Sequence, residues 1–159
     1  MRKIISLVLS SVLLSGMAAA AFHAGAISES TKAGPFTVTL KVLPAESFTG
    51  SGAAMVRDGG ARAVTLHSRL RPDRHLVVFV RRNGKPVKHA RVTIRYRRVQ
   101  NGGQAWKTLP VARMHVAGKG LATTHYGNNV NLLPGRYEVE VSVNGRKPAG
   151  FHFMYTGGR

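Results

Sequence analysis

Histidine and methionine side chains flank one Gly-rich turn in this chain, and they offer its most specific chemistry. Met114 and His115 precede the turn, and His125 follows it in the run His-Tyr-Gly. The chain has no cysteine, and thioether sulfur and imidazole nitrogen are the donors that remain for a soft or borderline metal ion. A further histidine, His67, lies upstream in a strand-like segment. His67, Met114 and His125 are therefore candidate ligands of a metal ion, with His115 as a substitute, and the alternative at each position is an ordinary core or surface residue.

Catalytic constellations are missing from the sequence. Nucleophilic catalysis needs an activated side chain beside a base, and general acid–base catalysis needs a paired acid and base. Here Asp58 and Asp73 fall in predicted loops, while Glu138 and Glu140 alternate on the solvent face of a predicted strand. No phosphate-binding glycine motif is present. The sequence predicts a protein that is not an enzyme.

The amino-terminal segment has the layout of a secretory signal peptide. Arg2 and Lys3 precede an apolar stretch at residues 4–14, which is too short to span a bilayer, and small residues follow it up to residue 26. We expect residues 1–26 to be cleaved and the protein to be periplasmic. Cleavage after Ala20 would instead leave His23 third from a free amine, an arrangement that chelates Cu(II) or Ni(II).

The charge of the chain is strongly positive. It has 24 Lys and Arg against 6 Asp and Glu, a formal net charge of +18. Such a surface attracts polyanions, and an exported protein meets anionic lipid or acidic polymer rather than nucleic acid. Hard dications need clustered carboxylates, whereas a site of neutral ligands for Cu(I) is less affected by the positive field. We expect no nucleic-acid partner and an anionic membrane surface as one partner.

The apolar pattern indicates β-structure throughout. Residues 36–43, 90–99 and 136–144 alternate with period two, and residues 75–82 form an almost continuous apolar run typical of a strand buried on both faces. Asn83-Gly84 is a hairpin signal. No amphipathic helix of useful length appears. These features predict an all-β fold, an immunoglobulin-like antiparallel β-sandwich of about seven to eight strands.

Three weaker segments complete the predicted layout. Residues 45–60 have the composition of a long loop, residues 63–70 form a weaker strand carrying His67, and residues 106–116 form a strand interrupted by a proline. We expect residues 27–35 to be a flexible leader and residues 36–159 to be a single sandwich domain.

The run from His125 to Val130, followed by Pro134-Gly135-Arg136-Tyr137-Glu138-Val139, resembles a family of periplasmic copper-binding proteins associated with high-affinity iron transport. The resemblance implies an immunoglobulin-like sandwich that binds copper through Met and His. It also implies dimer formation and an inner-membrane iron permease as partner. Met114 matches the methionine before the His-Tyr-Gly motif, and His67, which follows Met55, matches an upstream histidine ligand.

Departures from this family pattern favour copper over iron. Ser68 and Arg69 follow His67 where the family has an acidic residue, and Lys119 stands in the loop that usually carries an aspartate. The sequence thus predicts a non-enzymatic protein of metal uptake or handling that binds copper, with iron second. The alternative is a basic β-sandwich without a metal that docks on anionic envelope polymer or on an acidic partner protein.

Overall fold

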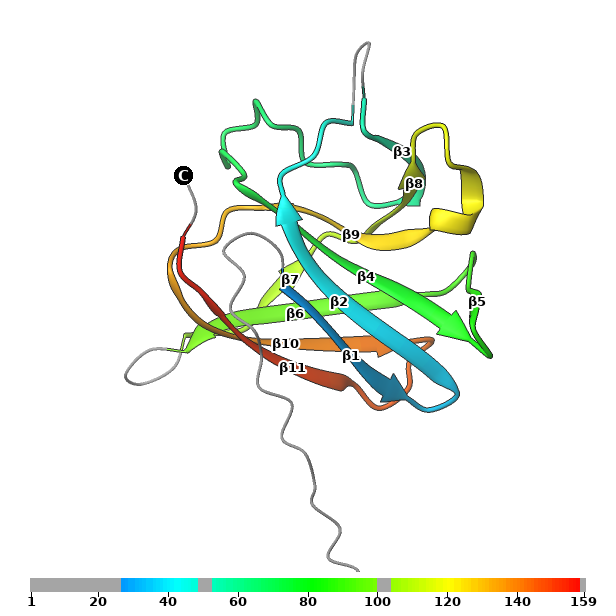
Figure 1. Ribbon diagram of the computed structural model, residues 1–159. Coiled ribbons are helices and arrows are strands. Elements are labelled where there is room, and N and C mark those ends of the chain that lie inside the picture. Colours follow the sequence, from blue (N-terminus) through cyan, green and yellow to red (C-terminus); the bar gives the residue numbers. More distant parts are fainter. Residues whose placement is uncertain (1–26, 49–52, 100–103, 158–159) are drawn as a thin grey trace, which may run out of the picture.

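Two antiparallel β-sheets make up the part of the chain that the computed structural model describes, residues 27–48, 53–99 and 104–157. These residues contain no α-helix, and their one helical segment is a short 3₁₀ turn, η1 (Gly120–Thr123). Figure 1 shows the sheets as two layers. The all-β, antiparallel prediction is confirmed, while the predicted signal peptide at residues 1–26 lies outside the described residues.

The larger sheet has seven strands within the described residues, in the order β1-β2-β4-β9-β8-β3, with β5 paired to β4. Their bounds are β1 (Ile27–Ala33), β2 (Phe36–Pro44), β3 (Met55–Gly60), β4 (Arg74–Arg82), β5 (Lys85–Pro86), β8 (Ala112–Val116) and β9 (His125–Val130).

The described part of the chain gives the smaller sheet four strands, in the order β11-β10-β6-β7. Their bounds are β6 (Val92–Val99), β7 (Lys107–Leu109), β10 (Gly135–Val143) and β11 (Ala149–Tyr155). The described residues therefore hold more strands than the seven to eight expected, because β1 and β3 were not predicted, residues 106–116 form two strands instead of one, and β5 is a pair of only two residues.

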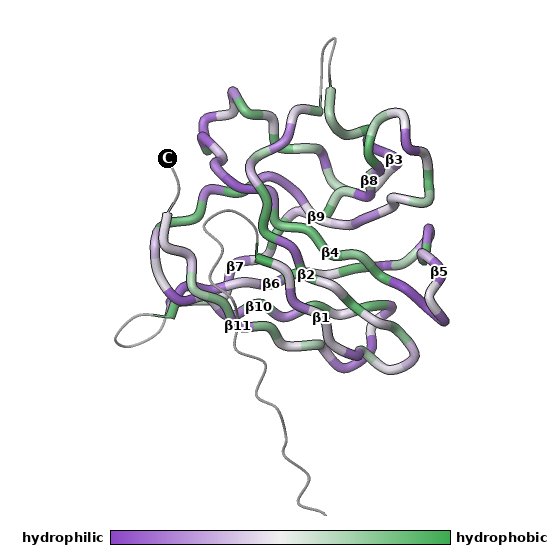
Figure 2. The backbone as a smooth tube through the Cα atoms, in the orientation of Figure 1, coloured by the Kyte–Doolittle hydropathy of each residue, from purple (hydrophilic) through white to green (hydrophobic). Residues whose placement is uncertain are grey.

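The main core lies between the two sheets. It is built from alternate residues, such as Val38 and Leu40 of β2, Val139 and Val141 of β10, and Phe151 of β11. Figure 2 shows the matching alternation of hydropathy along the strands and hydrophilic residues at the β4–β5 hairpin. Period-two burial along β2, β10 and β11 is what a strand packed on one face requires.

Pro110 marks the crossing from one sheet to the other. The single interrupted strand expected at residues 106–116 is two strands, with β7 paired to β6 in the smaller sheet and β8 paired to β9 and β3 in the larger one. A proline has no N–H for a ladder, so the strand ends there and the chain can change layers.

Two segments expected to be irregular are strands. Residues 27–35 were expected to be a flexible leader, but β1 pairs with β2 along its whole length. Gly34 turns the chain with φ +61°, and Ser30 hydrogen-bonds Thr39 across the hairpin at 2.7 Å. Polar β1 side chains therefore suit an edge strand whose backbone completes the ladder of β2. Within the expected loop 45–60, β3 pairs with β8.

The strand expected at residues 63–70 is absent from this described segment, which forms turns instead. Ser68 N–H donates to the Thr65 carbonyl and Arg71 N–H to the Ser68 carbonyl. The backbone of Val64 bonds to the side chains of Asn128 and Asn129 rather than to a neighbouring strand. Buried asparagine side chains thus replace the ladder partner that a strand would need.

Candidate metal centre

The outer face of the larger sheet carries a second, smaller apolar cluster, on the side away from the main core. On β4, Leu76 and Val78 enter the main core, whereas Val77 belongs to this second cluster together with Met55 and Met114. His75 shares the parity of Val77 and so faces the same way. The strand β4 is therefore buried on both faces, as its apolar run predicted.

Met114 and His125 are direct partners in the β8–β9 ladder. Side chains of directly opposed residues lie on one face with their Cβ atoms about 5 Å apart. Met114 is 0% exposed and His125 is 1% exposed. The structure thus brings together two of the three side chains that the sequence assigned to a metal site, in a setting closed to solvent.

A second buried histidine, His75, lies beside His125, although its position in the sequence did not suggest a place in the metal site. His75 is 0% exposed, and its ring lies edge to face with that of His125, the centroids being 5.8 Å apart. On β9, Gly127 lies midway between His125 and Asn129, which is the ladder partner of His75, and it pairs with Val77 of β4. A Cβ at Gly127 would come within 2.0 Å of the Leu76 carbonyl oxygen, so only glycine lets β9 approach β4 this closely.

Hydrogen bonds fix the tautomer of both rings. His125 Nδ1 lies 2.8 Å from the Thr123 carbonyl oxygen, which can only accept, so Nδ1 carries the proton. His75 Nδ1 lies 2.9 Å from Asn129 Oδ1. The Asn129 amide nitrogen donates to the carbonyls of Glu46 and Val64, which identifies Oδ1 as an acceptor and His75 Nδ1 as a donor. Each ring therefore keeps a lone pair on Nε2.

Both Nε2 atoms are buried and have no hydrogen-bond partner among the described residues. A buried polar atom without a partner is costly and calls for an explanation. An imidazole that donates Nδ1–H to a carbonyl and presents a bare Nε2 has the arrangement of a metal-ligating histidine with its supporting hydrogen bond. The chemistry of the pair is that of two preoriented nitrogen donors.

Burial keeps both rings neutral. Desolvation, followed by the nearby His125, lowers the pKa of His75 from its usual value to about 4. Desolvation also lowers the pKa of His125, against the hydrogen bond to Thr123, which favours the charged ring. Metal ions bind unprotonated imidazole, so the lowered pKa values leave both Nε2 atoms available at neutral pH.

The walls of this site are apolar and aromatic. Phe48 packs on His75 with ring centroids 5.6 Å apart, and Phe79 packs on His125 at 5.2 Å. Lys41 Nζ lies 5.3 Å from the centroid of the Phe79 ring. Met55 packs in the same cluster as Met114 and is also buried. Two neutral imidazoles and two buried methionines thus lie on this apolar face of the larger sheet.

His67 lies apart from this arrangement. Its side chain is exposed in a turn of the segment between β3 and β4, and no hydrogen bond or ring contact joins it to Met114 or His125 among the described residues. His115 faces away from Met114 and pairs through Nδ1 with Asp58 Oδ2 at 2.8 Å. The described residues hold no cluster of three His, Cys, Asp or Glu that could bind a metal ion, so any site here depends on methionine.

The sequence did contain a signal for His75. It begins the run predicted to be buried on both faces, and period two places it on the same face as Val77 and Phe79. A buried histidine in such a strand needs a partner for each nitrogen. Its proximity to His125 depends on the order of β4 and β9 in the sheet, which the sequence pattern does not determine.

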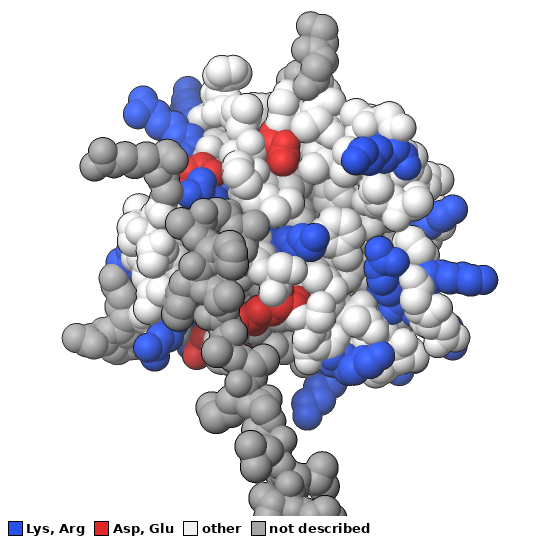
Figure 3. Space-filling model, viewed as in Figure 1, with Lys and Arg blue, Asp and Glu red and all other residues white. Residues whose placement is uncertain are grey.

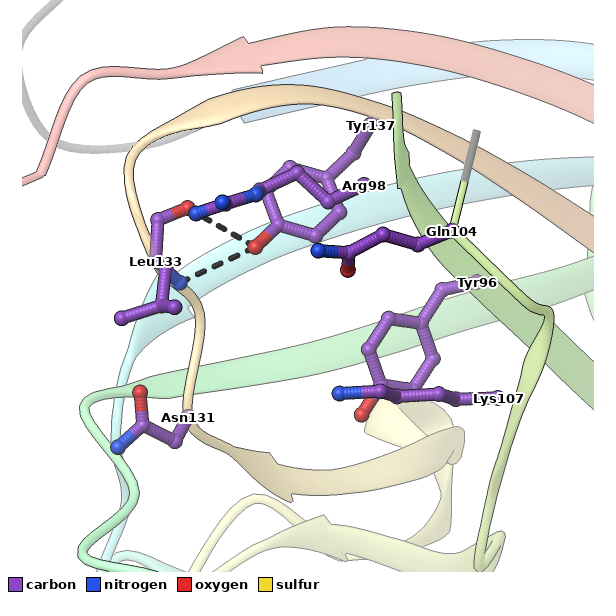
Figure 4. Close-up of a pocket in the computed structure, with 7 residues that line it drawn as sticks. All are labelled: Tyr96, Arg98, Gln104, Lys107, Asn131, Leu133 and Tyr137. Atoms are coloured by element: carbon purple, nitrogen blue, oxygen red, sulfur yellow. Dashed lines mark hydrogen bonds between the residues drawn. The ribbon is translucent and has the colours of Figure 1, made fainter. Parts of the chain in front are cut away.

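A small hollow elsewhere in the fold has a structural explanation. It has a volume of about 40 Å³ and is lined by Tyr96, Arg98, Gln104, Lys107, Asn131, Leu133 and Tyr137. Figure 4 shows the Tyr137 hydroxyl turned to the backbone of Leu133, to which it donates at 2.8 Å and from which it accepts at 3.0 Å. This space suits a water molecule or two, and the hydroxyl is already satisfied.

Comparisons with protein-family models, with curated proteins and with solved structures find no match to this chain. No helix among the described residues is long and apolar enough to cross a membrane. The function is therefore inferred from the geometry and chemistry of the site itself.

Proposed function

We propose that this protein is a non-enzymatic copper-binding protein of the periplasm, acting in metal uptake or handling. His75 Nε2, His125 Nε2 and the Met114 sulfur are the proposed ligands, with Met55 as a fourth donor. The observation that carries the proposal is the pair of buried Nε2 atoms without partners, each on a ring whose other nitrogen is held by a hydrogen bond. In this proposal His75 replaces His67, the upstream histidine expected from the sequence.

The donor set favours copper, and the reduced ion in particular. Thioether sulfur is a soft ligand that suits Cu(I), and imidazole suits copper in either oxidation state. The proposed donors are all neutral and include no carboxylate oxygen, which Ca²⁺ and Mg²⁺ require. Iron is disfavoured for a related reason, because no oxygen ligand is available in this set. The high positive charge of the chain further disfavours hard cations of higher charge.

An immunoglobulin-like sandwich is the proposed fold type. In such sandwiches a tyrosine near the start of a strand hydrogen-bonds back to the backbone a few residues upstream, at a corner between the sheets. Tyr137 makes this contact at the start of β10, where its hydroxyl bonds both the N–H and the carbonyl of Leu133. The arrangement supports the proposal, together with the two antiparallel sheets.

A Cu(I) titration against a competing chelator tests the proposed function. The protein should bind one ion, and His75→Ala and His125→Ala should each weaken binding by more than about 100-fold, since even supporting residues of metal ligands contribute 10- to 100-fold. His152→Ala is the matched control, because His152 is exposed on β11 of the other sheet, and its affinity should stay unchanged. Unaltered affinity in both His75→Ala and His125→Ala would refute the site.

A further inference from the structure

Basic side chains gather at one end of the sandwich, where the β1–β2 turn, the β4–β5 hairpin, the segment before β6 and the β10–β11 turn meet (Figure 1). We define the cationic end by six of the exposed cations at these turns: Lys32, Arg82, Lys85, Lys88, Arg91 and Arg146. They come from four separate segments of the chain, so their proximity is a property of the fold.

Backbone pairing brings these segments together. Arg82 is the ladder partner of both Phe36 and Lys85, and Phe36 in turn pairs with Ala33, next to Lys32. Arg91 N–H donates to Asn144 Oδ1 at 2.8 Å, which joins the segment before β6 to the β10–β11 turn.

The β10–β11 turn also reaches the β1–β2 turn. A Cβ on Gly34 would lie 3.3 Å from Cδ of Arg146. The four segments therefore share one surface, and the cations on them act as a group rather than as scattered charges.

The charge of this end is uncompensated in the described part of the chain. The ion pairs found there join Arg95 to Glu140, Arg97 to Glu138 and His115 to Asp58, and none involves the cationic end. Figure 3 shows Lys and Arg side chains over the β4–β5 hairpin at the right of the view, with no acidic side chain among them. Exposed cations without ion-pair partners repel one another, so the binding of a negatively charged partner at this end is favourable.

We propose that the cationic end docks the protein on a bilayer surface rich in anionic phospholipid. Two hollows, one lined in part by Tyr96 and Arg98 and the other in part by Arg62 and Leu70, include no cation of this end. The six cations are spread over four segments, and this arrangement suits a broad anionic surface better than a single small anion. Phe36, the aromatic residue at the β1–β2 turn, is buried, which removes the stacking platform that single-stranded nucleic acid needs. Exposed Lys and Arg side chains are attracted to anionic lipid headgroups when the two lie within about a Debye length of each other.

Docking in this way leaves the candidate metal centre free. His75 lies at the start of β4 and Arg82 at its end, so the bilayer would contact the end of the strand away from the histidine pair. The inference is independent of copper binding, and either proposal can fail without the other.

Co-sedimentation with vesicles tests the docking surface. The test variant changes Arg82, Lys85, Lys88 and Arg146 to Gln, and the matched control changes Arg62, Arg69, Arg71 and Lys119, four exposed cations elsewhere, to Gln. Both lose the same charge and keep the same residues 1–26, so any contribution of that segment cancels. The vesicles contain phosphatidylglycerol mixed with phosphatidylcholine, or phosphatidylcholine alone.

The proposal predicts salt-sensitive binding to the phosphatidylglycerol vesicles and little binding to phosphatidylcholine. The test variant should lose at least 10-fold in affinity and the control less than 3-fold. Equal losses in the two variants would overturn the proposal, because they would show a response to net charge alone. Tighter binding to poly-glutamate than to the vesicles at equal salt would also overturn it, in favour of an acidic protein partner.

Discussion

The rings of His75 and His125 meet edge to face at 5.8 Å, with the two unpartnered Nε2 atoms both buried in the outer face of the larger sheet. The two residues belong to adjacent strands. The Nδ1 atom of His75 is hydrogen-bonded to Asn129, and that of His125 to Thr123.

The first prediction separates the two upstream histidines. His67→Ala should leave copper affinity within about 3-fold of the parent protein, because its exposed side chain has no contact with the buried pair, while ligand loss exceeds the 10- to 100-fold typical of supporting residues. His75→Ala is the comparison, and it should lose most of the affinity. The measurement is Cu(I) competition, and the reverse order of effects would restore the assignment made from the sequence.

The second prediction concerns Asn129, which orients His75 and ties Glu46 and Val64 to β9. Asn129→Ala leaves buried polar groups unpaired, so the free energy of unfolding should fall by about 1–3 kcal/mol. Copper affinity should fall by roughly 10- to 100-fold.

The control for Asn129 is Asn131→Ala. Asn131 is exposed and makes only long hydrogen bonds, of 3.2 and 3.3 Å, to the carbonyls of Arg71 and Leu70. Its change should alter the free energy of unfolding by less than about 0.5 kcal/mol, as is usual for surface sites. Urea unfolding and copper competition give the two readouts, and equal effects from both variants would argue against an orienting role for Asn129.

The third prediction is a pH dependence of the metal-free protein. The pKa of His75 is lowered to about 4 on folding, so the unfolded chain binds more protons between about pH 6.5 and pH 4. The free energy of unfolding is therefore highest above pH 6.5, and it falls as the pH is lowered through this window. The loss amounts to about 3 kcal/mol of unfolding free energy, and His125, whose pKa is also lowered, acts in the same direction.

Urea unfolding with a chelator present, at several pH values, measures this loss. His75→Leu removes the titrating group, so its stability should change less over the same range. A parent protein and a His75→Leu variant with identical pH profiles would show that His75 is not held neutral by burial.

The sequence predicted much of the fold because period-two alternation reports burial directly. The strands β2, β6, β10 and β11 follow that pattern, β4 was predicted from its continuous apolar run, and Met114 and His125 were proposed from their donor types. His67 was assigned to the metal site because it lies upstream in a segment that was predicted to be a strand. Whether a residue lies near Met114 depends instead on the order of the strands in the sheet. The strand β1 was not predicted, because an edge strand needs backbone partners more than apolar side chains. Long-range pairing, such as Asn129 with His75, has no local signature.

The fourth prediction tests the close approach of β4 and β9. Gly127→Ala places a Cβ 2.0 Å from the Leu76 carbonyl oxygen and 2.7 Å from Val77 Cα. Both are backbone atoms, so the strands must separate, at a cost of at least about 2 kcal/mol of unfolding free energy.

Gly150→Ala is the control for Gly127, because nothing lies within 4 Å of a Cβ at that position on β11. It should change the free energy of unfolding by less than about 0.5 kcal/mol. Thermal or urea unfolding compares the two variants, and a Gly127→Ala protein as stable as Gly150→Ala would show that the strands are not held this close.

X-ray absorption at the copper edge, on protein loaded with Cu(I) and desalted, identifies the ligands of the bound ion. Cysteine is absent from the chain, so any sulfur neighbour of the metal must come from methionine. We expect one copper ion per chain, with two imidazole nitrogens and at least one sulfur in its coordination shell. A protein that loses its copper on desalting, or a shell of nitrogen and oxygen without sulfur, would contradict it.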